Sequence, residues 1–371
     1  AMNAPSMGCA PSSGASAGVY APSTSQVRAP RLKLNWRESL HSARHWEIDL
    51  REYTSPVYVP NTDEILAGSS TGRIVKARAG SGEVVWSSRL EGGIHANPVI
   101  SAGRAYVGTM AGHFYSLNMT TGEVDWSIQM RGSLETTAAV DGGRVFLTDS
   151  QDILYALDAA TGEILWQHQR RSPEFFTIKG GGTPVVDGNL VYSGFSDGRL
   201  AAIFVDSGEE AWVADLSADR RELVDVDLAI LIDGDRIYAA SYAGGMYALE
   251  RQDGLILWRR PIESIADFTI SGAQIFVASA VGRVHALDMN TGEQRWQFRF
   301  QEDVPVQISA TGPYLFISTA AGPLFIMDRW NGRPLSKWRP SPGFNSPVVF
   351  GGNRGYIISN GGYLYAFQLA Y

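Results

Sequence analysis

Apolar and polar residues alternate in short runs along most of this chain, and the runs return with a period of about 40 residues. One such run is Phe114–Asn118, and residues 154–158 and 284–288 repeat its pattern. Each is followed by a Thr-Gly turn and then by a tryptophan. The tryptophans of the repeat are Trp86, Trp126, Trp166, Trp212, Trp258 and Trp296. Because strict alternation bounded by glycine turns is typical of a half-buried strand, the pattern predicts β-structure rather than helices.

Each period contains four such runs, and the last one carries the tryptophan. Four short antiparallel strands per repeat are typical of a propeller blade. Eight copies of the second run begin near residues 65, 105, 145, 190, 237, 275, 315 and 356. The last copy lacks an outer strand, and Leu34–Glu38 resembles the missing piece. The sequence therefore predicts an all-β, eight-bladed β-propeller that the N-terminal strand closes by completing the C-terminal blade.

The first residues differ from the rest. Residues 1–34 are rich in Ala, Ser, Gly and Pro, so we expect a flexible tether there and the propeller over residues 35–371. The lone cysteine, Cys9, stands directly before the low-complexity stretch and resembles the lipidation site of a bacterial lipoprotein. No hydrophobic segment precedes Cys9 in this sequence, so the alternative that it has no such role stays open.

Charge and cysteine content exclude several classes of function. The net charge is −7, with 31 basic and 38 acidic residues, and no basic stripe is present to neutralise phosphates. Nucleic acid is therefore not an expected partner. A single cysteine excludes an intramolecular disulfide and any multi-cysteine metal site.

Two short patterns suggest a catalytic or metal site, but their context in the sequence does not support either site. Gly194–Gly198 matches the nucleophile elbow of a hydrolase, which requires a strand that turns into a helix. The equivalent positions of other repeats, 108–112 and 318–322, read as plain hairpin turns. His41 and His45 lie four residues apart without a helical pattern, so a metal site is not expected there. We predict no catalytic residue, no metal site and no cofactor.

Two repeats are six residues longer than their neighbours, and insertions of this kind fall in loops. We place the extra residues after Trp166 and after Trp212, in two connections that leave the same face of the ring. The first connection carries Phe176, Ile178 and Lys179, and the second carries Asp225 and Asp227. One interpretation is that Lys179 or Arg220 neutralises the acids within the propeller. The other is a protein-docking patch with apolar anchors and charges that set its register.

These segments carry a family resemblance. The blade pattern is similar to the quinoprotein-type propeller over nearly the whole chain. Residues 176–290 resemble the BamB family of outer-membrane assembly lipoproteins, in Ile178–Pro184, Leu223–Asp227 and Gly282–Leu287. The resemblance implies a periplasmic scaffold of the BAM machinery, held at the inner leaflet of the bacterial outer membrane by a lipid anchor and docked on the POTRA domains of BamA.

The same resemblance assigns the docking contacts to Phe176, Ile178, Lys179, Asp225 and Asp227. The family's usual arginine is replaced by Lys179, and an ammonium lacks the planar fork of a guanidinium. Unfolded outer-membrane protein chains are a second expected partner, through pairing with exposed blade edges. Two alternatives stay open, a quinone-cofactor (PQQ)-dependent dehydrogenase and a ligand-sensing propeller.

Overall fold

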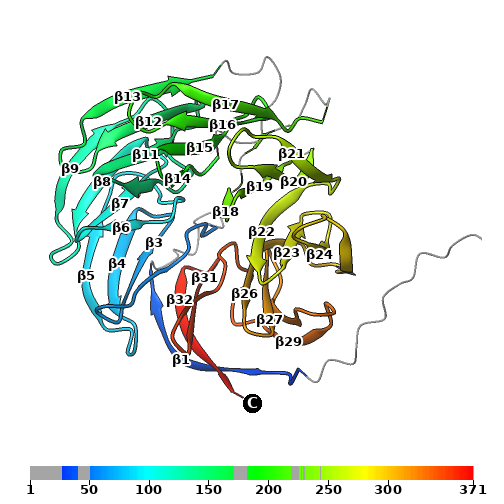
Figure 1. Cartoon of the computed structure of the whole chain (residues 1–371). Helices are drawn as coiled ribbons and strands as arrows, with labels where there is room; N and C mark the ends of the chain where they lie inside the picture. Colours follow the sequence, from blue (N-terminus) through cyan, green and yellow to red (C-terminus); the bar gives the residue numbers. More distant parts are fainter. Residues whose placement is uncertain are drawn as a thin grey trace, which may run out of the picture.

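The computed structural model describes residues 27–40, 51–170, 182–218, 225–226, 228, 230–242 and 244–370. All regular secondary structure of these residues is β-strand, in eight four-stranded antiparallel sheets. The sheets stand around a common axis as the blades of a ring (Figure 1). The predicted eight-bladed propeller is therefore confirmed.

Within blades 1 to 7 the strands follow chain order from the axis to the rim, whereas the outer strand of blade 8 is the N-terminal strand. Blades 1 to 4 consist of β2 (Val57–Val59), β3 (Glu64–Gly68), β4 (Arg73–Arg78) and β5 (Val84–Arg89); β6 (Val99–Ser101), β7 (Arg104–Gly108), β8 (His113–Asn118) and β9 (Val124–Gln129); β10 (Ala139–Asp141), β11 (Arg144–Thr148), β12 (Ile153–Asp158) and β13 (Ile164–Gln169); β14 (Val185–Asp187), β15 (Leu190–Gly194), β16 (Arg199–Phe204) and β17 (Glu210–Asp215).

Blades 5 to 8 complete the ring. They consist of β18 (Leu231–Asp233), β19 (Arg236–Ser241), β20 (Gly245–Glu250) and β21 (Ile256–Arg260); β22 (Ile265–Ser271), β23 (Gln274–Ser279), β24 (Arg283–Asp288) and β25 (Gln294–Arg299); β26 (Pro305–Thr311), β27 (Tyr314–Thr319), β28 (Leu324–Asp328) and β29 (Pro334–Trp338); β30 (Val349–Gly351), β31 (Arg354–Ser359), β32 (Tyr363–Ala370) and β1 (Arg31–Ser39).

The outer tryptophans join each blade to the next. The indole of Trp126 donates to the carbonyl of Ala159 at 3.3 Å, and its ring covers Gly162, which has φ +77°. A side chain at Gly162 would meet the ring, because an added Cβ would lie 2.6 Å from Trp126 Cε3. The same indole-to-carbonyl bond and glycine contact occur at Trp36, Trp86, Trp166, Trp212, Trp258 and Trp296. The tryptophans pack blade on blade, as their spacing predicts.

The hydrophobic core is divided among the interfaces of the ring. Eight buried clusters occur, and each draws its residues from two neighbouring blades. Middle-strand side chains such as Leu147, Leu249 and Ile317 are at most 1% exposed. Because each buried aliphatic side chain contributes about 1.5–3 kcal/mol, no blade is stable without its neighbours.

The N-terminal strand closes the ring. Strand β1 pairs antiparallel with β32, and the two strands lie side by side in Figure 1. The indole of Trp36 reaches blade 1, where it donates to Ala79 O at 3.1 Å. The predicted closure is confirmed, and the strand begins at Arg31, four residues before the expected boundary at residue 35.

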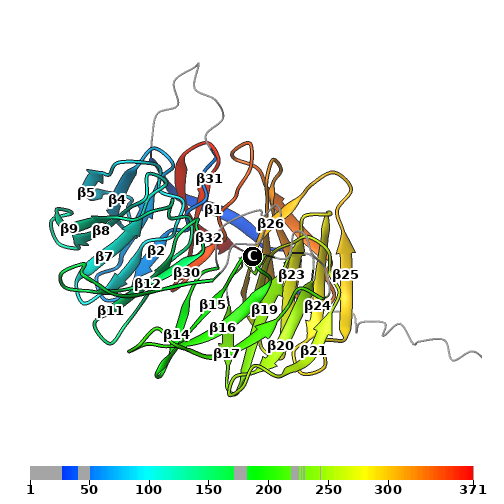
Figure 2. The same ribbon diagram turned by 90° about the horizontal axis from the view of Figure 1, so that it is seen from above.

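The connections between blades and the turns between the second and third strand of each blade lie on one face, because the strands alternate in direction. We call this the connection face. Backbone hydrogen bonds join its parts; for example, Met110 N–H in a turn of blade 2 donates to Gly93 O in the preceding connection at 2.8 Å. Figure 2 shows the ring turned by 90° from the view of Figure 1, so that the loops on its two faces come into view.

Candidate functional site

The first long connection leads from blade 3 into blade 4, and the second leads from blade 4 to blade 5. The first resumes at Gly182, whose N–H donates to Gly194 O at 2.8 Å, and the second passes back over the same hairpin, where Val226 N–H donates to Phe195 O at 3.2 Å. Glycine is required at this crossing, because a Cβ on Gly194 would lie 2.0 Å from Val226 O and one on Gly182 2.7 Å from it. Gly182 of the first connection and Val226 of the second therefore lie against the same hairpin of blade 4.

Of the predicted docking residues, the structure describes Asp225. Phe176, Ile178, Lys179 and Asp227 lie outside the described residues, as does the predicted lipidation site Cys9. Asp225, which the sequence analysis places among the docking contacts, is 1% exposed. Its carbonyl accepts a hydrogen bond from Tyr242 N–H at 3.1 Å. Asp225 therefore holds the connection to blade 5 from a buried position.

Buried acidic residues lie beneath this crossing. Asp152, in the hairpin turn of blade 3, is 3% exposed and accepts the Ser196 N–H at 3.0 and 3.3 Å. Burial, together with the negative charges of Asp197 and Asp225, raises the pKa of Asp152 to about 6, although the hydrogen bonds from Ser196 act in the opposite direction.

An arginine that the sequence analysis did not single out compensates part of this charge. Arg170, directly after β13, donates from Nε to Asp197 Oδ2 at 2.9 Å, and it also contacts Glu210. Its guanidinium lies 5.8 Å from the ring centre of Phe195. Arg170 and Asp197 are 17% and 18% exposed, so this ion pair is shielded from salt better than a surface pair.

His168 completes this group. Its Nδ1 lies 3.1 Å from Gly208 O, and its Nε2 lies 3.3 Å from Glu210 Oε1. The four side chains of Arg170, His168, Asp197 and Glu210 lock the start of the first long connection onto blade 4. A sequence signal existed only in the position of Arg170 at the base of the inserted segment, because its partners come from other strands.

Ser196 has no catalytic arrangement. The segment 195–198 is a turn between β15 and β16, in which Gly198 N–H donates to Phe195 O at 3.2 Å. The motif requires a helix after the serine, and β16 follows instead. Ser196 is 5% exposed, and its N–H is held by Asp152. The hairpin interpretation of Gly194–Gly198 is confirmed.

A second concave site lies on the axis of the ring. A cavity of about 750 Å³ is lined by innermost residues of all eight blades. Its ionisable wall residues are Glu135, Asp267 and His95, and the described residues that line it include no lysine or arginine. Burial raises the pKa of Asp267 to about 7, although Ile308 N–H donates to its Oδ2 at 2.8 Å. The cavity is therefore acidic or neutral in character.

Comparison with known proteins places the chain in a family. A sequence profile described as "Outer membrane protein assembly factor BamB" matches residues 36–138 and 70–298. An outer membrane protein assembly factor BamB of Legionella pneumophila is 38% identical over 309 residues, which cover 81% of this chain and 80% of that protein. The chain belongs to the BamB family.

A further relative and two solved structures are also similar to this chain. BamB of Pseudomonas aeruginosa is 27% identical over 52% of this chain and 53% of its own length. The crystal structure of BamB from Moraxella catarrhalis superimposes with a TM-score of 0.80 at 21% identity, over 91% of this chain and all of that chain. A quinohemoprotein alcohol dehydrogenase from Comamonas testosteroni shares the fold, with a TM-score of 0.73 at 14% identity over 91% of this chain and 76% of that chain.

The quinone cofactor suggested by this last neighbour does not suit the axial cavity. Pyrroloquinoline quinone is a polycarboxylate, and a buried polycarboxylate needs cationic or multiple N–H partners. The described lining residues supply two carboxyls and neither a lysine nor an arginine. Among the described residues, no group of three or more His, Cys, Asp or Glu side chains could hold a metal ion. In the same part of the chain, no helix is long and apolar enough to cross a membrane.

Proposed function

We propose that this protein is a non-catalytic periplasmic scaffold of the outer-membrane β-barrel assembly machinery that docks on the POTRA domains of BamA through its connection face. Membership of the BamB family supports the assembly role and the compartment. Cys9 remains the predicted point of attachment to the inner leaflet of the outer membrane, and unfolded outer-membrane protein chains remain a predicted second partner.

The observation that carries the docking proposal is the convergence of both inserted connections over blade 4. Gly182, Gly194 and Val226 fix where the two segments cross, and Arg170 with Asp197 fixes where the first one starts. A rigid base of this kind presents inserted side chains at low entropic cost on binding. Phe176, Ile178, Lys179 and Asp227 belong to the inserted segments, and Asp225 serves as a buried support for the second.

A binding measurement tests the proposal. The purified propeller is titrated against the POTRA segment of BamA from its own organism by calorimetry, together with the double variant Phe176→Ser, Lys179→Glu. We expect the variant to bind at least about tenfold more weakly, because it loses both the apolar anchor of Phe176 and the positive charge of Lys179.

The matched control also replaces one apolar residue by serine and one basic residue by glutamate, but on the opposite face. Val124→Ser with Arg333→Glu alters an exposed apolar and an exposed basic residue near the tryptophan-covered turns. Equal weakening by both double variants would contradict a docking role for the connection face. Asp225→Arg is unsuitable as a probe, because a guanidinium at a site that is 1% exposed is expected to disrupt the local fold.

A further inference from the structure

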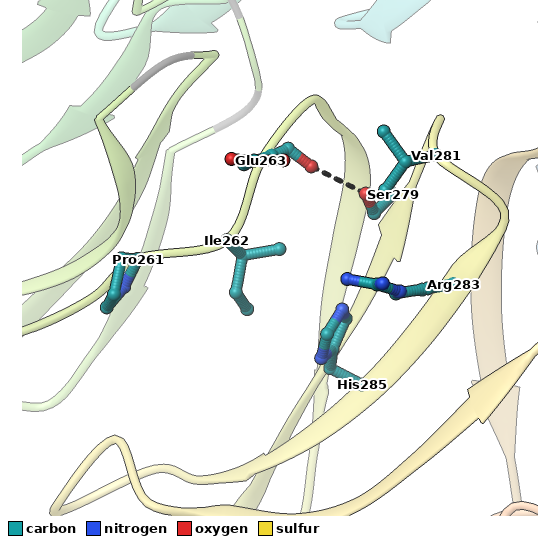
Figure 3. A pocket seen from close by; sticks show the side chains of 7 residues that line it. All are labelled: Pro261, Ile262, Glu263, Ser279, Val281, Arg283 and His285. Atoms are coloured by element: carbon teal, nitrogen blue, oxygen red, sulfur yellow. Dashed lines mark hydrogen bonds between the residues drawn. The ribbon is translucent and has the colours of Figure 1, made fainter.

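A small pocket opens on the connection face between blades 5 and 6. Its volume is about 290 Å³, and Figure 3 shows its seven lining residues. Pro261 and Ile262 come from the connection between β21 and β22, and Val281 from the turn after β23. Arg283 and His285 project from the start of β24, and their side chains lie next to each other across from Ile262 (Figure 3).

Arg283 brings an uncompensated positive charge to this pocket. Its Nε is buried and has no hydrogen-bond partner. Its cross-strand neighbour on β25 is Arg299, and like charges placed opposite each other destabilise a sheet. Among the described residues, Arg260, Arg283 and Arg299 form no ion pair, in a protein whose net charge is −7.

The positive charge near the pocket also affects the pKa of the neighbouring histidine, His285. His285 is 6% exposed, and its Nδ1 lies 3.0 Å from Gln294 Oε1. Burial lowers the pKa of His285, and the charges of Arg283 and Arg260 lower it further. At neutral pH the imidazole is uncharged, so the guanidinium is the cationic group of the pocket.

The acidic residues near this pocket are directed elsewhere. The carboxylate of Glu263 points away from Arg283 in Figure 3, while the Glu263 carbonyl accepts a hydrogen bond from Ser279 Oγ at 2.5 Å. Asp303, in the next connection, has its carboxylate against Gly322 of blade 7. A buried guanidinium donor that has no hydrogen-bond partner, and no ion pair with an acid of the described residues, is suited to an external anion.

We propose that this pocket binds a carboxylate side chain, an aspartate or glutamate, of the protein that docks on the connection face. The apolar walls of the pocket favour a carboxylate side chain over a phosphate group. Pro261, Ile262 and Val281 offer apolar contact to the methylene stem of an acidic side chain, while the oxygens reach Arg283. A phosphate has no such stem and would leave these walls without a partner.

The pocket is continuous with the proposed docking surface, and its assignment to a docked partner rests on that proposed function. Tyr242 N–H donates to Asp225 O at 3.1 Å, and Ser264 N–H donates to Tyr242 O at 3.2 Å. Ala280 N–H then donates to Ser264 O at 2.8 Å, which brings the chain of hydrogen bonds to the rim of the pocket. A partner that covers the second long connection would thus reach Arg283 in the adjacent blade.

The first test needs no partner protein. The probe is glutamate capped as its N-acetyl methylamide, with the equally capped glutamine as control and inorganic phosphate as the competing anion, all at equal ionic strength. NMR follows the His285 ring protons against pH. We expect saturable binding of capped glutamate with a rise in the His285 pKa, because a carboxylate beside the imidazole favours its charged form.

The titration distinguishes a carboxylate site from a phosphate site and from no site at all. No saturable change with capped glutamate, or an equal change with capped glutamine, overturns the carboxylate site. A stronger response to phosphate than to capped glutamate overturns the choice of anion. Loss of the response in Arg283→Gln, with partial recovery in Arg283→Lys, supports the guanidinium as the binding group.

The second test uses the docked complex. Arg283→Gln is expected to bind the POTRA segment about tenfold more weakly, because a charge-assisted contact is lost. Arg333→Gln makes the same charge change at an exposed position on the opposite face and is expected to leave affinity unchanged. Equal affinities of Arg283→Gln and the unaltered protein overturn the assignment to the partner. Absence of binding by the unaltered protein overturns the proposed function instead, while the capped-glutamate titration still decides the pocket.

Discussion

Asp152, Asp197 and Asp225 bring three carboxylates together between blades 3, 4 and 5, and their surroundings differ. Asp197 has Arg170 as a partner at 2.9 Å. Asp152 is held by the backbone N–H of Ser196 and has a raised pKa of about 6, with burial as the main cause. At this scale, Asp197 is held by an arginine where the first connection starts, whereas Asp152 is held by a backbone N–H.

The raised pKa of Asp152 predicts a pH dependence of stability. A carboxyl whose pKa rises from 3.8 to about 6 on folding stabilises the fold most when it is protonated, below the unfolded pKa, and this contribution is lost as pH rises through 6. Asp152→Asn removes the charge, and asparagine tolerates the positive φ of 60° at this position. The advantage of the variant in unfolding free energy should therefore grow as the pH rises from 4 to 7, by about 2–3 kcal/mol in all.

Urea unfolding of both proteins at several pH values in this range measures that difference. A stability difference that stays constant with pH, or that shrinks as pH rises, would show that ionisation of Asp152 does not destabilise the fold. Other carboxyls titrate equally in both proteins, so the comparison isolates Asp152.

At the scale of elements, the blade is defined by the turn that leads into its outer strand. Asp158 accepts the N–H groups of Ala160 and Thr161 at 2.9 and 2.8 Å, and this fixes the turn. Gly162 then takes φ +77° beneath the ring of Trp126. The turn chemistry is local, but the ring that covers it comes from the preceding blade, so each turn is completed only by its neighbour.

Two glycines with the same backbone conformation separate these effects. Gly162 and Gly103 have φ of +77° and +76°, but an added Cβ meets Trp126 at 2.6 Å in the first case and nothing within 4 Å in the second. We expect Gly103→Ala to cost about 1–2 kcal/mol, from backbone strain alone. Gly162→Ala should cost about 1–3 kcal/mol more, because the indole must move. Chemical unfolding of the two variants measures this, and equal losses would refute the role given to the tryptophan contact.

At the scale of the whole molecule, stability depends on closure. The eight core clusters lie between blades, and the one between blades 8 and 1 contains Leu40 and Tyr356 together with Ile65. Strand β1 holds this interface through its pairing with β32 and through Trp36. An open arc would expose two apolar blade faces, so the chain ends must meet for the fold to persist.

Trp36 therefore has a larger effect than its position at the chain terminus suggests. Trp36→Ala should lower the unfolding free energy by about 2–4 kcal/mol, because its indole bridges to blade 1. Trp330 is 52% exposed and stacks only against Arg329 at 4.1 Å, so Trp330→Ala should cost less than about 1 kcal/mol. Urea unfolding of both variants tests the difference. Similar losses would mean that β1 contributes no special closure.

The sequence alone determined the architecture, because every blade of a propeller repeats the same local pattern of strands and turns. Alternating runs, glycine turns and tryptophans recur at nearly constant spacing, and each depends mainly on contacts within a blade or with its neighbour. The count of eight blades and the closing role of Leu34–Glu38 followed from that regularity. The position of the two long connections followed from the departures from it.

Only the tertiary structure decided which side chains meet on the connection face. Asp225 became a buried support, and Arg170 joined Asp197 across two blades. Arg283 faces Arg299 and forms no ion pair within the part of the chain that the structure describes. These pairs lie on different strands, and burial depends on how connections fold across neighbouring turns. A one-dimensional pattern specifies which face of a strand is apolar, but the balance of charge in a site depends on distances between segments that the pattern does not contain.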